Sequence, residues 1–135
     1  MRISQKLEYA SRAMTQLARH HDGQTLTRLD DLAQREAVSA NFLVQILNDL
    51  RRGGLIISKR GKDGGYLLSR HPSEITLLEI VHSTEPALLE KNNIQPGESG
   101  PRVQQTWEDV SQVLEAKLKS ITLESLTTQT PMFYI

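Results

Sequence analysis

The chain has 135 residues with 16 basic and 16 acidic side chains, and it contains no cysteine. The length predicts one small domain with an appended helix or two, and the lack of thiols excludes a disulfide scaffold, a thiolate zinc site and a cysteine-ligated iron–sulfur cluster. No apolar run reaches the roughly 18 residues of a membrane span, and the first residues lack the apolar stretch of a signal peptide, so we expect a cytoplasmic protein with no membrane contact.

Positive charge is concentrated in the first half of the chain. Residues 1–75 hold 12 Lys and Arg against 8 Asp and Glu, whereas residues 76–135 hold 4 against 8. Within residues 51–70, six basic side chains accompany one acidic side chain. A local positive field attracts a phosphate backbone more effectively than the net charge suggests, although a solvated basic face would show the same pattern.

The first elements that the sequence predicts are three helices. Apolar residues at steps of three and four indicate a helix over residues 4–21. Thr27 and Asp30 form a weak capping box, so we expect a short second helix to start there. Ser39 is a favourable N-cap, and the apolar stripe after it predicts a third helix that ends at the glycine pair 53–54.

The hydrophobic period then changes to that of strands. Residues 55–59 and 66–69 are short apolar runs on either side of a glycine-rich loop, which is typical of a β-hairpin. Thr76 and Glu79 form another capping box, which predicts a fourth helix.

The last third of the chain predicts a loop, a long helix and a tail. Proline, asparagine and glycine are frequent over residues 86–100, which is typical of a loop. From Pro101 an apolar stripe continues for about 18 residues, or roughly 27 Å of helix. A short helix is expected from Thr122 to Leu126, and residues 127–135 follow it. The stripe consists of Val103, Trp107, Val110, Leu114, Leu118 and Ile121.

Helix, short helix, helix and hairpin in this order is typical of a winged helix-turn-helix. The third helix is narrow enough for a major groove, where amides pair with adenine and a valine contacts a thymine methyl group. The basic hairpin tip suits phosphates or a narrow minor groove. An ordinary amphipathic helix would show the same stripe, so the prediction depends on the whole combination. The predicted DNA contacts are Ser39, Asn41, Val44, Gln45 and Asn48 of the helix and Lys59, Arg60 and Lys62 of the hairpin.

Four segments carry a more specific pattern. They are residues 1–10, residues 43–55 with the ending Leu-Arg-Arg-Gly-Gly-Leu, residues 60–68 with Arg-Gly and Gly-Gly-Tyr-Leu-Leu, and residues 75–80. Together with Trp107 and residues 122–126, these segments resemble the Rrf-type bacterial winged-helix regulators, a family that includes IscR, NsrR and CymR. The resemblance covers essentially the whole chain. It implies a homodimeric transcription factor on a pseudo-palindromic operator of double-stranded DNA.

The resemblance extends the predicted organisation. It implies that the long helix crosses its partner in a dimer, although packing of its stripe on the same chain is the alternative. The expected fold is therefore mainly α with a small β-hairpin. Residues 1–85 form a winged helix-turn-helix DNA-binding domain, 86–100 a loop, 101–126 the dimerisation helix with a short helix, and 127–135 a tail. The resemblance adds Arg2, Ser4, Lys6, Arg51 and Tyr66 to the DNA contacts.

Two features depart from the family pattern. Many members hold an iron–sulfur cluster through three cysteines in the loop before the long helix, whereas residues 88–105 have none. Oxygen donors such as Glu90 and Glu98 do not replace thiolates, so we expect no metal and no cofactor. Related regulators often carry Glu where this chain has Val44. A valine cannot accept a hydrogen bond from cytosine, so we expect a different operator.

The tail predicts a partner. Met132, Phe133, Tyr134 and Ile135 resemble the end of the cysteine-free CymR branch, which regulates cysteine and sulfur metabolism with cysteine synthase. The cleft of that enzyme accepts peptides that end in isoleucine, because it is built for a carboxylate. The resemblance implies a repressor that holds cysteine synthase on its tail until O-acetylserine competes for the cleft. Packing of the tail on the protein's own dimer is the alternative.

Other functions have weaker support. His20 and His21 lie at a predicted helix end, where a cation is favourable, and the carboxylates of Asp30 and Asp31 diverge on a helix. We therefore predict no catalytic residue and no enzyme activity. A winged helix that binds only proteins would lack the steep salt dependence of DNA binding. A regulator of the same fold that responds to a small-molecule effector or another stress signal, without cysteine synthase, is the main alternative.

Overall fold

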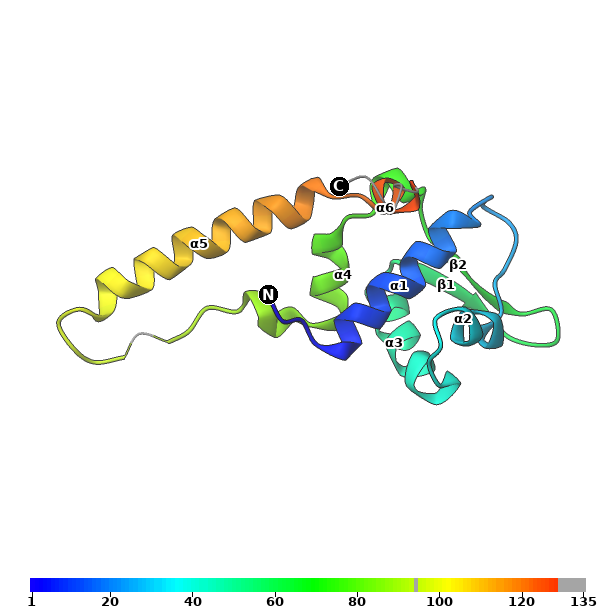
Figure 1. The fold of residues 1–135 in the computed structure, drawn as a ribbon, viewed down its shortest axis with the longest axis horizontal. Coiled ribbons are helices and arrows are strands. Elements are labelled where there is room, and N and C mark those ends of the chain that lie inside the picture. Colours follow the sequence, from blue (N-terminus) through cyan, green and yellow to red (C-terminus); the bar gives the residue numbers. More distant parts are fainter. Residues whose placement is uncertain (94, 129–135) are drawn as a thin grey trace, which may run out of the picture.

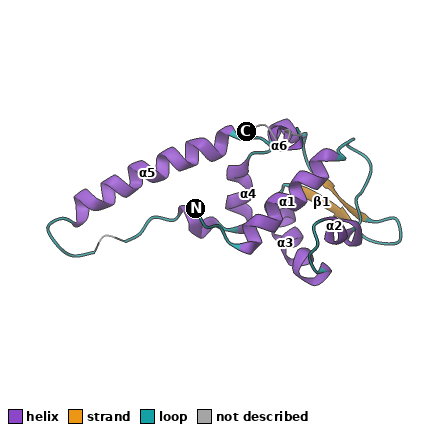
Figure 2. Cartoon of the chain, in the orientation of Figure 1, coloured by secondary structure: helices purple, strands orange, loops and turns teal. Residues whose placement is uncertain are grey.

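The computed structural model describes residues 1–93 and 95–128 (Figure 1). It confirms the predicted class, because helices dominate and a two-stranded antiparallel hairpin lies between the third and fourth of them (Figure 2). The α-helices are α1 (Gln5–Arg19), α2 (Leu29–Arg35), α3 (Ala40–Arg52), α4 (Leu77–Thr84), α5 (Gly100–Ser120) and α6 (Leu123–Thr127). The strands are β1 (Ile56–Lys59) and β2 (Gly65–Leu68), and short 3-10 helices cover η1 (Pro72–Glu74) and η2 (Pro86–Leu89).

Capping side chains mark where several helices begin. The hydroxyl oxygens of Ser4 and Ser39 each accept a hydrogen bond of 3.1 Å from a backbone N–H in the first turn of α1 and α3. Thr76 and Glu79 make both hydrogen bonds of the predicted capping box at the start of α4. Each cap satisfies a backbone donor that the helix itself leaves unpaired. The predicted starts of these three helices are confirmed.

The predicted capping box at Thr27 is wrong. The N-cap of α2 is Arg28, whose side chain makes no capping hydrogen bond. Thr27 pairs instead with Tyr66 of β2 through two backbone hydrogen bonds of 2.8 Å. This pairing satisfies the donor and the acceptor of Thr27 together, and its partner is distant in sequence, so a local pattern does not reveal it.

We call residues 56–68 the wing. Its strands pair in the register that places Ile56 opposite Leu68 and Lys59 opposite Gly65. Thr27 lies against the outer edge of β2, and a Cβ atom on Gly65 would lie 2.6 Å from the carbonyl oxygen of Thr27. Glycine also tolerates the φ of +153° found at this position. The wing is therefore fixed to the segment that leads into α2.

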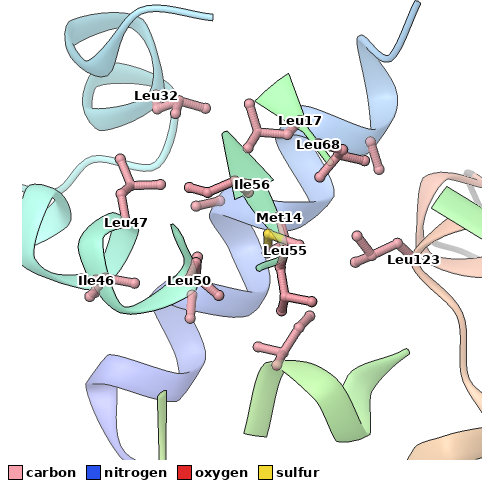
Figure 3. Close-up of a cluster of buried hydrophobic side chains, with 14 of the residues drawn as sticks. Met14, Leu17, Leu32, Ile46, Leu47, Leu50, Leu55, Ile56, Leu68 and Leu123 are labelled. Atoms are coloured by element: carbon pink, nitrogen blue, oxygen red, sulfur yellow. The ribbon is translucent and has the colours of Figure 1, made fainter. Parts of the chain in front are cut away.

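The hydrophobic core lies between α1, α3, α4 and the base of the wing. Figure 3 shows Met14 of α1, Leu47 of α3 and Ile56 of β1 in one cluster, and all three are buried. Leu123 of α6 is fully buried in the same cluster. Its backbone N–H donates to the carbonyl of Ile75 at 2.9 Å, which connects α6 to the residue before the N-cap of α4. The core therefore holds α3 and the wing in a fixed relation.

Helix α5 contributes no buried residue. It extends away from the core, so its first turns lie at the end of the molecule opposite the wing (Figure 1). It begins at Gly100, one residue before the predicted Pro101, and it spans 21 residues. The predicted apolar stripe does not have the same surroundings along its length. At its C-terminal end, Leu118 packs against the core and Ile121 is the C-cap of the helix. Neither α5 nor any other described helix has the length and apolar character of a membrane span.

Candidate DNA-binding surface

A cleft of about 510 Å³ separates the outer side of α3 from the wing. The helix and the hairpin approach it from opposite sides, and the core holds both in place. The cleft brings together side chains that are far apart in the sequence and that we predicted as DNA contacts. These residues are Val44, Asn48, Arg51, Lys59, Arg60 and Tyr66.

The lining of this cleft is mostly basic. Arg51, Lys59 and Arg60 line it and are exposed. Arg28 adds a fourth cation, and Asp30 is the acidic residue of the lining. Several cations around one concave surface attract a polyanion and orient it by contacts with its phosphates.

A second hollow, of about 370 Å³, lies on the other side of α3. Its lining includes Lys6 and Gln45, and Asn48 lines both hollows. The outer side of α3 is therefore a ridge between two grooves, as expected for a helix that inserts into a major groove. Lys6 forms an ion pair with Asp49, whose carboxylate also accepts from Arg52, so part of the charge of Lys6 is already compensated.

The remaining predicted residues lie at the margins of this surface. Asn41 is exposed in the first turn of α3, beside the cap Ser39, which is also exposed. Ser4 is less accessible, because its hydroxyl accepts from the N–H of Leu7 and donates to Glu85 Oε2 at 2.7 Å. Arg2 is exposed and Lys62 is exposed at the tip of the wing, but neither lines the two hollows.

Arg28 is a residue of the surface that the sequence prediction missed. It immediately precedes α2 and lines the cleft. Its guanidinium donates to the backbone carbonyl of Lys62 at the wing tip, across 34 positions of sequence. The contact restrains the tip, while the exposed charge adds to the field of the cleft. An isolated arginine before a helix matches no short sequence pattern that predicts DNA binding. Arg28 reaches the cleft because Thr27 pairs with Tyr66 of the wing, which is a tertiary contact.

Comparisons with known proteins agree with this geometry. Residues 3–129 match the Rrf2 family model, which is described as an iron-dependent transcriptional regulator. A helix-turn-helix-type transcriptional regulator of Mycobacterium tuberculosis is 39% identical over 128 residues, which cover 93% of this chain and 78% of the relative. IscR of Photorhabdus laumondii is 34% identical over 131 residues, which cover 93% and 79%.

Several solved structures have a fold similar to that of this chain. The structure of CymR, described as the global cysteine regulator of B. subtilis, has a TM-score of 0.81 to this chain at 32% identity, and the match covers 97% of this chain and 99% of CymR. In sequence, CymR of Bacillus subtilis is 33% identical over 141 residues, which cover all of both proteins.

The residues of this chain do not fit a cluster of iron held by thiolates. The chain has no cysteine, and the described side chains that surround the loop before α5 offer carboxylate, amide and ammonium groups, including those of Glu90, Lys91 and Gln104. These are hard donors or cations, whereas iron–sulfur clusters require soft thiolates. The residues of this chain therefore do not support iron-dependent control through a thiolate-held cluster.

Proposed function

Because the chain belongs to the Rrf2 family of transcriptional regulators, we propose that it is a homodimeric DNA-binding repressor of genes for cysteine and sulfur metabolism, acting in the cytoplasm. The observation that carries the DNA-binding part is the basic cleft between α3 and the wing. The similarity in sequence and structure to CymR supports the metabolic assignment.

In this proposal α3 enters the major groove. Gln45 and Asn48 present amides that pair with adenine, and Val44 presents methyl groups to thymine. Arg51 and the wing cations contact phosphates on either side of the groove. Val44 accepts no hydrogen bond, so the operator differs from those that a glutamate at this position selects through cytosine.

The dimer is proposed from the exposed side of α5. Val103, Trp107, Val110 and Val113 are each more than half exposed, with Trp107 at 66% and Val113 at 71%. A row of exposed apolar side chains on a projecting helix is unfavourable in water and is stabilised when another apolar surface packs against it. A second copy of α5 offers the same row. The interface that we propose adds Val113 to the residues predicted from the sequence, whereas Leu118 packs against its own core. A dimer places two copies of α3 on half-sites about 34 Å apart.

The proposed partner is cysteine synthase, bound through the last residues of the chain. Met132, Phe133, Tyr134 and Ile135 lie outside the described residues, so the support comes from the sequence. A cleft built for an amino-acid substrate has room for the apolar side chain of Ile135, and the two aromatic side chains add rigid contact area. O-acetylserine competes for the same cleft and releases the regulator.

The DNA-binding proposal is tested with an operator selected from a random duplex library. We expect Gln45→Ala to weaken operator binding by about 1–3 kcal/mol and to relax the base preference at one position in each half-site. Gln112→Ala is the matched control, because Gln112 is an exposed amide on α5 outside both hollows. Equal affinities of the two variants in fluorescence anisotropy would overturn the placement of α3.

The partner proposal has a separate test. Purified cysteine synthase is titrated into the full chain and into a chain that ends at residue 131, with calorimetry as the measurement. We expect binding of the full chain alone and its loss on addition of O-acetylserine. No binding of either chain would remove cysteine synthase as a partner, and equal binding of both would remove residues 132–135 as its binding segment. Either result would leave the DNA-binding regulator in place.

A further inference from the structure

Asp49 is an acidic side chain within the proposed DNA-binding surface. It follows Asn48 on α3 and lines the second hollow together with Lys6, Gln45 and Arg52. A carboxylate repels the phosphates of DNA, so an acidic residue at this place opposes binding unless its charge is compensated. What compensates it shows how the charge of this surface is set.

Both carboxylate oxygens of Asp49 are paired with cations. Oδ2 pairs with Lys6 Nζ of α1, which packs against α3, and Oδ1 pairs with Arg52 Nη2 one turn further along α3 (Figure 1). The side chain of Asp49 is only 15% exposed, whereas those of Lys6 and Arg52 are 44% and 66% exposed. The carboxylate is therefore shielded by two cations that reach solvent. A cytosine amino group would have to displace one of them to contact it.

The two ion pairs have consequences for the binding of any duplex. Two cations and one carboxylate leave a single net positive charge at this side of α3. Affinity for a phosphate backbone depends on how many phosphates the protein neutralises, and cations that are already paired neutralise fewer. The ion pairs also restrict two long side chains, so less conformational entropy is lost when these side chains meet phosphates in that geometry.

We propose that Asp49 is a specificity-determining residue of this surface, an inference that rests on the proposed DNA-binding function and deepens it. Asp49 lowers the attraction of Lys6 and Arg52 for DNA of arbitrary sequence. On the operator, base contacts of Gln45 and Asn48 fix α3 in the groove, and the two cations are already held where the backbone phosphates lie. On another duplex no base contact fixes α3, so the compensated charge leaves only weak binding.

Asp49→Asn tests this inference, because it removes the charge and keeps the shape of the side chain. Anisotropy titrations over a salt series use the selected operator and a duplex of the same base composition in scrambled order. We expect affinity for the scrambled duplex to rise about tenfold at roughly 0.1 M salt, and its slope of log K to steepen by about 1–2. Operator affinity rises less, because Lys6 and Arg52 are no longer ordered in advance, so discrimination between the duplexes falls.

Matched variants separate this effect from net charge and from stability. Asp31→Asn removes the same charge from an exposed position on α2 that lines neither hollow beside α3, and is expected to leave discrimination unchanged. Asp49→Glu retains the charge and is expected to stay closer to the native slope than Asp49→Asn. Asp49→Ser is a second uncharged side chain at the same position. Circular dichroism and urea denaturation of each variant measure its fold and stability.

A double-mutant cycle tests the coupling between Lys6 and Asp49. Lys6→Met is made in the native chain and in the Asp49→Asn chain. We expect it to reduce the salt slope by about 1 in the Asp49→Asn chain and by less in the native chain, where Asp49 already compensates Lys6. Equal reductions in the two chains would contradict the compensation.

Three further results would overturn the proposal. An unchanged slope in a folded Asp49→Asn chain would mean that Asp49 only joins α1 to α3. A loss of operator affinity with altered preference at one base pair would make Asp49 a base contact. Equal loss of discrimination in Asp31→Asn would reduce the effect to net charge. A native chain that binds neither duplex would instead refute the proposed DNA-binding function, and this inference with it.

Discussion

Gly65 controls how closely the wing approaches the segment before α2. A Cβ atom there would lie 2.6 Å from the carbonyl oxygen of Thr27, and the backbone on both sides is hydrogen-bonded. We expect Gly65→Ala to lower the free energy of unfolding by about 3 kcal/mol, because the Thr27–Tyr66 pairing must open. Gly61 has a positive φ of +105° but open space around it, so Gly61→Ala is expected to lower the free energy of unfolding by only about 1 kcal/mol. Urea denaturation of both variants is the measurement, and equal costs would contradict the close approach.

Asp22 organises the turn after α1. Its carboxylate accepts from the hydroxyl of Thr25 and from the backbone N–H groups of Thr25 and Gln24, and these hydrogen bonds lower the pKa of Asp22 from 3.8 to about 2. A lowered pKa in the folded state stabilises the turn above pH 3.8, and this contribution is lost as the pH falls toward 2. We expect Thr25→Val to raise the pKa of Asp22 toward its ordinary value, measured by a carboxyl NMR titration. An unchanged midpoint would mean that the backbone donors alone hold it.

The residues that the sequence predicts well are those whose role is local. Ser4, Ser39 and Thr76 cap helices through partners three positions away, which a linear pattern shows. Arg28 and Thr27 act through the wing, and their partners are 34 and 39 positions distant, so no short pattern indicates them. The Ser4 hydroxyl shows both cases, because its cap is local and its bond to Glu85 spans 81 positions.

At the scale of elements, the proposed function assigns phosphate contacts to the wing and base contacts to α3. We expect Arg60→Ala to weaken binding to all duplexes alike and to reduce the salt slope of log K by about 1, because one phosphate contact is lost. Arg19→Ala is the control, since Arg19 is exposed at the end of α1 and lines neither of the two hollows beside α3. Anisotropy titrations over a salt series measure both slopes. A loss restricted to the selected operator would instead make Arg60 a base contact.

Elements were predictable where hydrophobic period and caps agree, as in α1, α3, α4 and the hairpin. The period of α5 indicates a helix but not what covers its apolar side, because the same stripe suits packing on its own core and packing on a second chain. The structure separates the two ends of the stripe, since Leu118 packs against the core and Val103 is 51% exposed. That division depends on how α5 leaves the core, which is a tertiary property.

At the scale of the whole molecule, charge and exposed apolar surface are separated. The basic first part of the chain contains α3 and the wing, whereas the acidic second part contains α5, whose first turns lie at the opposite end (Figure 1). A dimer joined through α5 therefore leaves both basic clefts free for DNA. When one copy of a dimer binds its half-site, the other copy is held at a high effective concentration beside the second half-site, which raises the overall affinity. We therefore expect a variant that cannot dimerise to lose operator affinity as well.

Val110→Asp tests this coupling. Val110 is 52% exposed within the apolar row of α5, so the single chain tolerates the charge while a dimer interface does not. We expect the mass from light scattering to halve and operator affinity to fall by about a hundredfold or more, with little change for an isolated half-site. Gln112→Asp adds the same charge two positions away, on the other side of the helix, and is expected to stay dimeric. A Val110→Asp chain that stays dimeric would exclude this side of α5 as the interface. A monomeric variant with full operator affinity would instead show that one copy suffices for DNA binding.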